Sequence, residues 1–143
     1  MNRKQRHLGR ELALLWLYQI DAGKVPVEDA LADISEEIEG AEEEAIDFGR
    51  SLVRGITSDK VPLDRAIVKY ARGWSFSRLA IVERNILRIA LYEIMNMPDI
   101  PASVSIDEAV EFAKRYGSEE SGKFVNGILG AYMRGEKQNP EVA

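Results

Sequence analysis

The chain has 143 residues, no cysteine and one histidine, and its formal net charge is −5. This length suits one domain with a buried core, and the absence of cysteine excludes disulfides, thiolate zinc sites and cysteine nucleophiles. No apolar run reaches the roughly 20 residues of a membrane span and no signal-peptide pattern is present, so we expect a cytoplasmic protein without membrane contact.

Apolar residues recur with helical spacing along the first part of the chain, and no segment alternates with the period of a strand. Asn2 is placed to cap a first helix that ends near Ala22, with Gly23 as its left-handed stop. A second helix is expected to run from Val27 to Gly40. The apolar positions of a third helix are Ala45, Phe48, Leu52 and Ile56.

Two further helices are predicted in the middle of the chain. Pro62 suits the first turn of a short helix that closes at Gly73. Ser77 is placed to cap a long fifth helix that ends before Pro98. Glu93 falls on the apolar side of that helix, where an unpaired carboxylate would be costly, so we expect it to pair with an arginine or to cap a backbone group.

The last two helices follow a connector that contains two prolines. Ser105 and Glu108 match the S-x-x-E capping box of a sixth helix, which stops at Gly117. A seventh helix is expected to begin at Glu119 or Ser121 and to end at residue 134.

Seven helices joined by short links predict an all-α fold of two small packed helical bundles. We expect the two sub-bundles at about residues 1–60 and 61–135, within a single domain that covers residues 1–143. The polar residues 135–143 are expected to form a disordered tail.

One short motif imitates a phosphate-binding loop. Residues 117–123 read GSEESGK and have the glycine and lysine spacing of a P-loop. The next residue is Phe124 where a Ser or Thr belongs, the motif follows a helix rather than a strand, and its glutamates would face the phosphates. We therefore interpret it as a helix N-terminus, favoured by Glu119 and Glu120. No residue pattern indicates an enzyme, a metal site or a cofactor.

The first helix carries a basic stripe that suits RNA. Arg3, Arg6, His7 and Arg10 follow the spacing of one helix face, and the same face continues to Tyr18. Cations that bind phosphates beside a ring that stacks a base are typical of single-stranded RNA recognition. The alternative is that the arginines are merely solvated and that Tyr18 belongs to the edge of the core.

Several stretches of the sequence resemble the NusB family of bacterial transcription antitermination factors. The strongest are RLAIVERNILRIALYE at residues 78–93, IDEA at residues 106–109 and GKFVNGIL at residues 122–129. The resemblance implies an all-α fold that binds the boxA element of nascent RNA together with NusE, a small-subunit ribosomal protein. It further implies loading onto the RNA polymerase elongation complex and read-through of terminators in ribosomal RNA operons.

The resemblance also implies particular contact residues. For RNA they are Arg3, Arg6, Arg10, Tyr18, Arg88 and Phe124, whereas His7 joins this group through helix spacing alone. For the protein partner they are Glu83, Glu108 and Glu120, the last two at the starts of the last two helices. Family members usually begin with a denser arginine run, whereas here His7, Leu8 and Gly9 follow Arg6. Gly9 also weakens the first helix, so we expect low RNA affinity without NusE.

Two other functions stay open on the sequence alone. NusB-like domains also precede RNA methyltransferase domains, so the chain could be an RNA-binding accessory module of an RNA-modification or ribosome-assembly system. It could also be a purely structural interaction protein whose basic stripe is solvated. Helix faces rich in Ala, Gly and Leu would suit a homodimer as well as a core.

Overall fold

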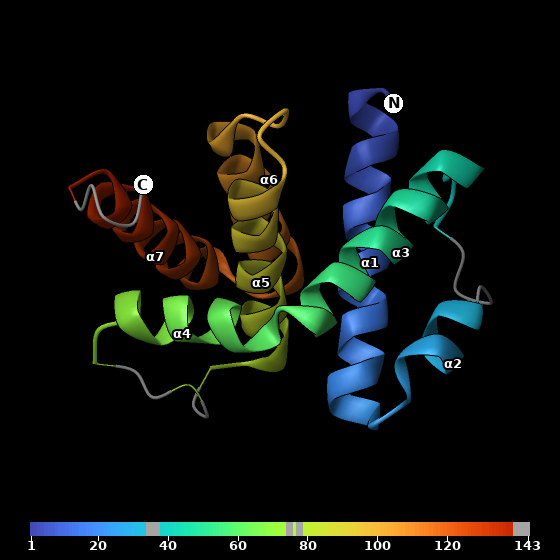
Figure 1. Cartoon of the computed structure of the whole chain (residues 1–143), viewed down its shortest axis with the longest axis horizontal. Helices are drawn as coiled ribbons and strands as arrows, with labels where there is room; N and C mark the ends of the chain where they lie inside the picture. The colour runs from blue at the N-terminus through green and yellow to red at the C-terminus, as the bar shows by residue number, and fades with distance from the viewer. Residues whose placement is uncertain (34–37, 74–75, 77–78, 139–143) are drawn as a thin grey trace. The chain divides into compact units, whose positions relative to one another are not determined.

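The computed structural model describes residues 1–33, 38–73, 76 and 79–138, and within them it contains seven helices and no strand (Figure 1). The all-α class predicted from the sequence is confirmed. None of the described helices has both the length and the apolar character needed to cross a bilayer. The helices are α1 (Arg3–Gly23), α2 (Val27–Ala32), α3 (Glu43–Ser58), α4 (Lys60–Tyr70), α5 (Ile81–Asn96), α6 (Ala102–Tyr116) and α7 (Glu119–Gln138).

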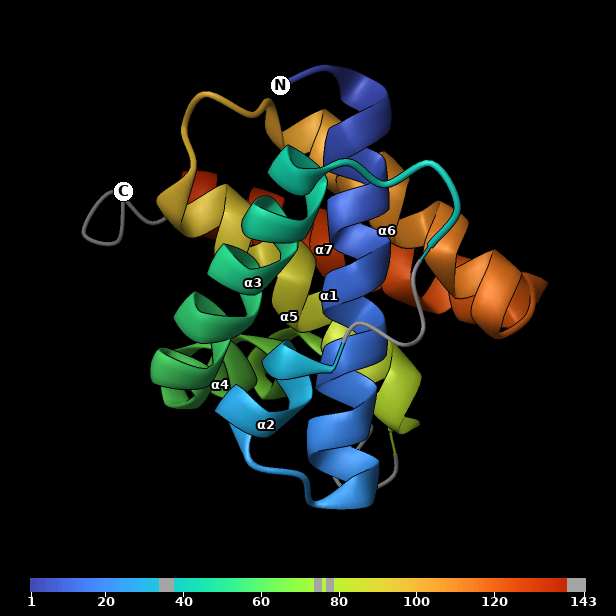
Figure 2. The same cartoon turned by 90° about the vertical axis from the view of Figure 1, so that its right-hand side faces the viewer.

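The chain divides into two compact units, Met1–Asp59 and Lys60–Ala143. In the first unit α1 packs against α3 (Figure 2). The helices meet at two glycines: a Cβ placed on Gly9 would lie 2.7 Å from the carbonyl oxygen of Ala45, and a Cβ placed on Gly49 would lie 2.7 Å from the carbonyl oxygen of Gly9. Only glycine allows backbones to approach so closely, which explains why α1 retains a residue that weakens it.

A buried glutamine fixes the approach to α3. The Gln5 side chain, only 3% exposed, donates from Nε2 to the Gly40 carbonyl at 3.1 Å and accepts the Glu42 N–H at 2.8 Å. Both backbone groups precede the first turn of α3. The acidic start of α3 is thereby held against the basic N-terminal part of α1.

The ends of α1 agree only partly with the prediction. Asn2 caps the helix as expected, because its Oδ1 accepts the Gln5 N–H at 2.8 Å. At the other end, the left-handed residue is Lys24, with φ of 54°, and Gly23 remains helical. The prediction placed the helix stop one residue too early.

The second helix is much shorter than predicted. α2 ends at Ala32, whereas the apolar spacing predicted a helix as far as Gly40. Trp16 of α1 donates its indole N–H to the Asp33 carbonyl at 3.1 Å, which satisfies a backbone group just after the helix end. Ile34, which was predicted to lie in this helix, is outside the described residues.

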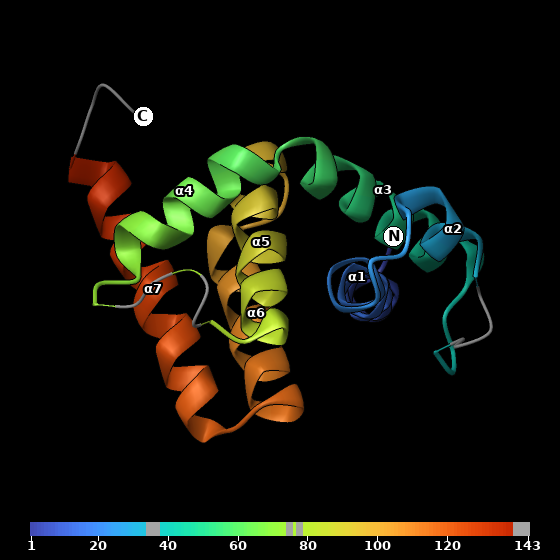
Figure 3. The same ribbon diagram turned by 90° about the horizontal axis from the view of Figure 1, so that it is seen from below.

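In the second unit α5 contacts α4, α6 and α7 (Figure 3). Its buried face includes Leu87 and Leu91, which are 0% and 1% exposed. α5 begins at Ile81, with the Ala80 N–H bonded to the Glu83 carboxylate at 3.3 Å, so the predicted cap at Ser77 is wrong; Ser77 itself lies outside the described residues.

The predicted capping box of the sixth helix is wrong. α6 begins at Ala102, directly after Pro101, so Ser105 already lies within the helix and its N–H bonds to the Pro101 carbonyl. The Ser105 hydroxyl instead donates to Glu93 at 2.8 Å, and both side chains are buried. A serine hydroxyl, which the sequence interpretation did not consider, is therefore a partner of the Glu93 carboxylate on the apolar side of α5.

Candidate RNA-binding and partner-binding surfaces

The basic stripe of α1 begins at the surface. Arg3 is exposed, and Arg6 and His7 are half-buried. Neither arginine forms an ion pair with another residue in the described part of the chain. The charges of Arg3 and Arg6 therefore have no carboxylate partner among the described residues, and the Arg6 Nε atom is itself buried.

Further along α1 the basic stripe becomes buried. Arg10 is only 2% exposed, and its guanidinium carbon lies 6.0 Å from the ring centroid of Phe48 in α3. Tyr18 is exposed again, at 46%. The helical rise puts it about 12 Å beyond Arg10 along the axis. The RNA candidates on α1 that reach the surface are thus the cations Arg3 and Arg6, with the half-buried His7 beside them, and a separate exposed ring.

The guanidinium of Arg88 in α5 makes its hydrogen bonds to other residues of the second unit. It is 3% exposed, and its guanidinium forms a fork onto Asp64 of α4 with N–O distances of 2.7 and 3.0 Å. A third nitrogen donates to Asn85 at 2.9 Å, and the ring of Phe76 lies 5.4 Å away. This geometry favours a role in the fold, and an RNA phosphate could reach Arg88 only by displacing the carboxylate.

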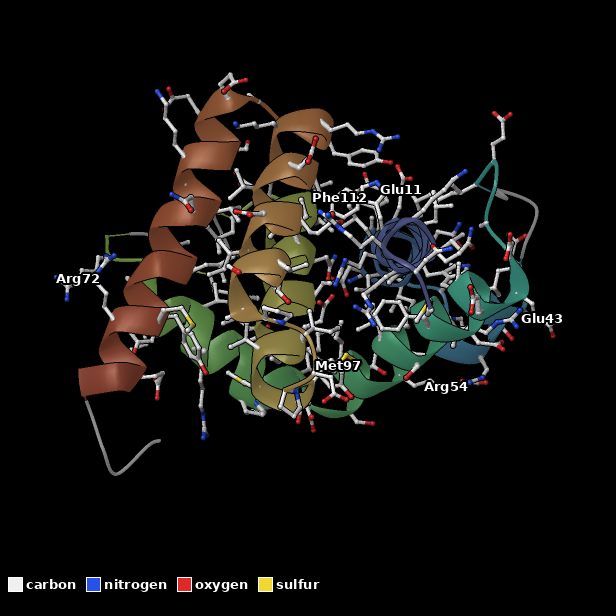
Figure 4. All side chains as sticks on the ribbon, turned by 90° about the horizontal axis from the view of Figure 1, so that it is seen from above. Glu11, Glu43, Arg54, Arg72, Met97 and Phe112 are labelled. Atoms are coloured by element: carbon white, nitrogen blue, oxygen red, sulfur yellow. The ribbon has the colours of Figure 1, made fainter. Side chains whose placement is uncertain are left out.

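Phe124 lines a cavity of about 600 Å³ in the second unit. One side is formed by residues at and after the end of α4, and the other by α7; Figure 4 shows Arg72 beside α7. The aromatic and cationic residues of the cavity are Tyr70, Arg72, Lys123, Phe124 and Arg134. Sequence reasoning found only Phe124 with its neighbour Lys123, because no local spacing connects the end of α4 with the last turns of α7.

One wall of this cavity is held in place by a tyrosine pair. The Tyr70 hydroxyl donates to Glu136 at 2.9 Å, and the Tyr70 ring packs edge-to-face against Tyr132 with centroids 5.6 Å apart. Burial raises the pKa of the Tyr132 hydroxyl above its ordinary value, with Glu136 and Tyr70 adding to the effect. The Tyr132 hydroxyl, neutral at physiological pH already at its ordinary pKa, therefore stays neutral into more alkaline conditions.

The three glutamates implied as partner contacts differ in exposure. Glu83 is half-buried and bonds to the backbone at the start of α5. Glu108 is also half-buried and lies well inside α6, because that helix starts at Ala102 rather than near Ser105. Glu120 is in the first turn of α7 with a side chain 86% exposed, 3.8 Å from Lys123. Of the three, Glu120 is the most accessible to a partner.

The segment that imitates a phosphate-binding loop connects two helices. Gly117 caps the C-terminus of α6, and the Ser118 hydroxyl accepts the Ser121 N–H at 3.2 Å at the start of α7. Its interpretation as a helix N-terminus is confirmed. Among the residues that the structure describes, no group of His, Asp and Glu could hold a metal ion.

The sequence profile of the NusB family matches residues 7–134. The chain belongs to the NusB family. The transcription antitermination protein NusB of Carboxydothermus hydrogenoformans is 49% identical over 129 residues, which cover 87% of this chain and 90% of that protein. The NusB of Symbiobacterium thermophilum is 45% identical over 139 residues, which cover 92% of this chain and 91% of the relative.

Solved NusB structures share the fold. T. maritima NusB is 39% identical and covers 90% of both chains with a TM-score of 0.80. A chain from the crystal structure of antitermination factors NusB and NusE in complex with dsRNA is 28% identical, with a TM-score of 0.83 over 94% of this chain and 99% of that chain. The NusB resemblance inferred from residues 78–93 and 122–129 is thereby confirmed at the level of family and fold.

Proposed function

We propose that this member of the NusB family binds boxA RNA together with NusE and delivers the pair to the RNA polymerase elongation complex. In this role it favours read-through of terminators in ribosomal RNA operons, in the cytoplasm. The observation that carries the proposal is the cluster of Arg3 and Arg6, whose charges have no ion-pair partner in the described part of the chain. A NusB relative of the same fold has been crystallised with NusE and dsRNA, which supports both partners.

In the proposed complex the arginines of α1 bind RNA phosphates, and the exposed Tyr18 ring stacks on a base. His7 adds a hydrogen-bond donor on the same face. Arg10 contributes indirectly, because its contact with Phe48 fixes the α1 face against α3. On the protein side, the exposed carboxylate of Glu120 attracts a basic surface of NusE, with Glu83 and Glu108 as further contacts.

Fluorescence anisotropy of a labelled boxA-like RNA tests this proposal, with a scrambled RNA as the reference and with NusE absent or present. We expect preference for boxA, strengthened by NusE. Arg6→Ala should weaken binding about three- to tenfold because one phosphate contact is lost. Arg65→Ala, which removes an exposed arginine from α4, is the matched control and should bind like the unaltered protein. Equal affinity for both RNAs in the presence of NusE would refute the proposal.

A further inference from the structure

A second cavity lies in the first unit, where α2 packs against α3 (Figure 2). Its volume of about 430 Å³ is within the range of roughly 300–1,000 Å³ that is usual for small-molecule sites. All of its lining residues belong to α2 and α3, so the cavity can be evaluated from this unit alone. Four of them are charged, two of each sign.

One arginine of this cavity is held in place while part of its guanidinium stays unbonded. The half-buried Arg50 donates from Nε to the Leu31 carbonyl at 3.2 Å, and its guanidinium carbon lies 5.9 Å from the ring centroid of Trp16 in α1. The two terminal nitrogens of Arg50 have no hydrogen-bond partner among the described residues. Because the side chain is already ordered, a carboxylate that binds these nitrogens costs it little conformational entropy.

The remaining charges leave one carboxylate without a partner. Arg54 forms a fork onto Glu28 with N–O distances of 3.0 and 3.3 Å. These hydrogen bonds lower the pKa of Glu28 and raise the pKa of Arg54, so the two charges are matched to each other. Asp47, one helical turn before Arg50, is exposed and pairs with no cation among the described residues. The cavity therefore presents one cation and one anion that are both unpaired.

We propose that this cavity binds a small zwitterion of the α-amino acid class, with its carboxylate on Arg50 and its ammonium group at Asp47. A lone anion would be repelled by Asp47 and a lone cation by Arg50, whereas a zwitterion is attracted by both. Guanidinium groups bind carboxylates through two parallel hydrogen bonds. The Ser51 hydroxyl adds a donor and an acceptor, and Leu31 and Ala32 supply apolar surface for a short side chain. None of these residues belongs to the proposed RNA or NusE contacts.

L-Alanine is the direct probe, and its matched controls are propionate, which lacks the amino group, and ethylamine, which lacks the carboxylate. The full chain, labelled with ¹⁵N, is titrated with each compound in the absence of RNA and NusE. We expect L-alanine to shift the amide signals of Ala32 and Ser51 and the Nε–H signal of Arg50. A Kd on the order of 1 mM suits a ligand of about six non-hydrogen atoms. Propionate and ethylamine should each bind roughly tenfold more weakly or less, because each leaves one charge of the cavity unmatched.

Two substitutions on α3 locate the site without altering Arg50. Asp47→Asn should weaken L-alanine about tenfold because the partner of the ammonium group is lost. Glu44→Gln is its matched control, since Glu44 is an exposed carboxylate of the same helix that does not line the cavity, and it should bind like the unaltered protein. Ser51→Leu should abolish the shifts, because the longer side chain occupies the cavity and leucine favours a helix more than serine does.

Three results would overturn the inference. They are the absence of shifts with L-alanine, shifts that propionate or ethylamine reproduces at the same concentration, and undiminished binding in both Asp47→Asn and Ser51→Leu. Because the titrations contain neither RNA nor NusE, such a result leaves the proposed function intact. Conversely, a failure to bind boxA RNA would leave the cavity inference intact.

Discussion

The guanidinium of Arg88 illustrates how the role implied by a sequence resemblance can differ from the contacts in the structure. Its position in a NusB-like segment implies an RNA contact, whereas the structure buries it to 3% exposure. The fork onto Asp64 uses two nitrogens, and Asn85 takes the third. A planar fork of this kind requires arginine, because a lysine ammonium presents a single point charge.

Arg88→Lys separates the two roles. It keeps the charge and loses the fork, so we expect the free energy of unfolding in urea to fall by about 2 kcal/mol. RNA affinity of the folded variant should stay within twofold. Asp64→Asn is the companion variant and should lower stability by a similar amount. A tenfold loss of RNA affinity with unchanged stability would instead place Arg88 in the RNA contact.

Helix spacing identified which residues share the face of α1 but could not identify which of them reach solvent. Arg3, Arg6 and Arg10 are equivalent in the pattern, yet Arg10 is buried because Phe48 of α3 lies over it. That contact depends on how α1 and α3 cross. The same limit applies to Arg72, whose cavity exists only because the end of α4 lies beside α7. The roles of the three α1 arginines in RNA binding remain predictions.

At the scale of the helices, the sequence predicted their number and order well, because apolar spacing is a strong local signal. Helix ends were less predictable. Asn2 caps α1 as expected, since its hydrogen bond reaches only to Gln5. Ser105 has the same kind of local signal, but its hydroxyl bonds to Glu93 in another helix. A polar side chain that hydrogen-bonds a buried residue of another helix is not available to cap its own helix.

The crossing of α1 and α3 yields a stability prediction. In Gly49→Ala the new methyl group would lie 2.7 Å from the Gly9 carbonyl oxygen and 3.1 Å from the Trp16 ring, so the helices must separate. We expect a loss of about 1–3 kcal/mol in the free energy of unfolding, measured by urea denaturation. Gly127→Ala is the control, because that position is open and should tolerate the change. Equal stability of the two variants would contradict the close contact.

At the scale of the whole molecule, the net charge of −5 opposes the binding of RNA in general. The charges are not evenly spread, because the first turns of α1 are basic and the first turn of α3 carries Glu43 and Glu44. Gln5 links the two regions through its bonds to Gly40 and Glu42. The acidic first turn of α3 thus follows directly on the segment that Gln5 of α1 holds.

The salt dependence of RNA binding measures how many cations take part. For single-stranded RNA the slope of log affinity against log salt changes by about 0.7 for each phosphate contact. We expect Arg3→Ala and Arg6→Ala each to reduce the slope by about that amount, in anisotropy titrations at several salt concentrations. Arg65→Ala should leave the slope unaltered. If RNA binding involved no phosphate contact by Arg3 or Arg6, the slope would be the same in all three variants and in the unaltered protein.

The contact between Gly9 and Gly49 also constrains how this sequence can change over generations. Gly9 lies in the sequence between Arg6 and Arg10, and an arginine there would extend the run of charge. That substitution is blocked while α3 keeps its present path, because any side chain at position 9 meets the Ala45 carbonyl and the Phe48 ring. A lineage that gains RNA affinity must therefore recruit cations elsewhere on the surface, or alter α1 and α3 together.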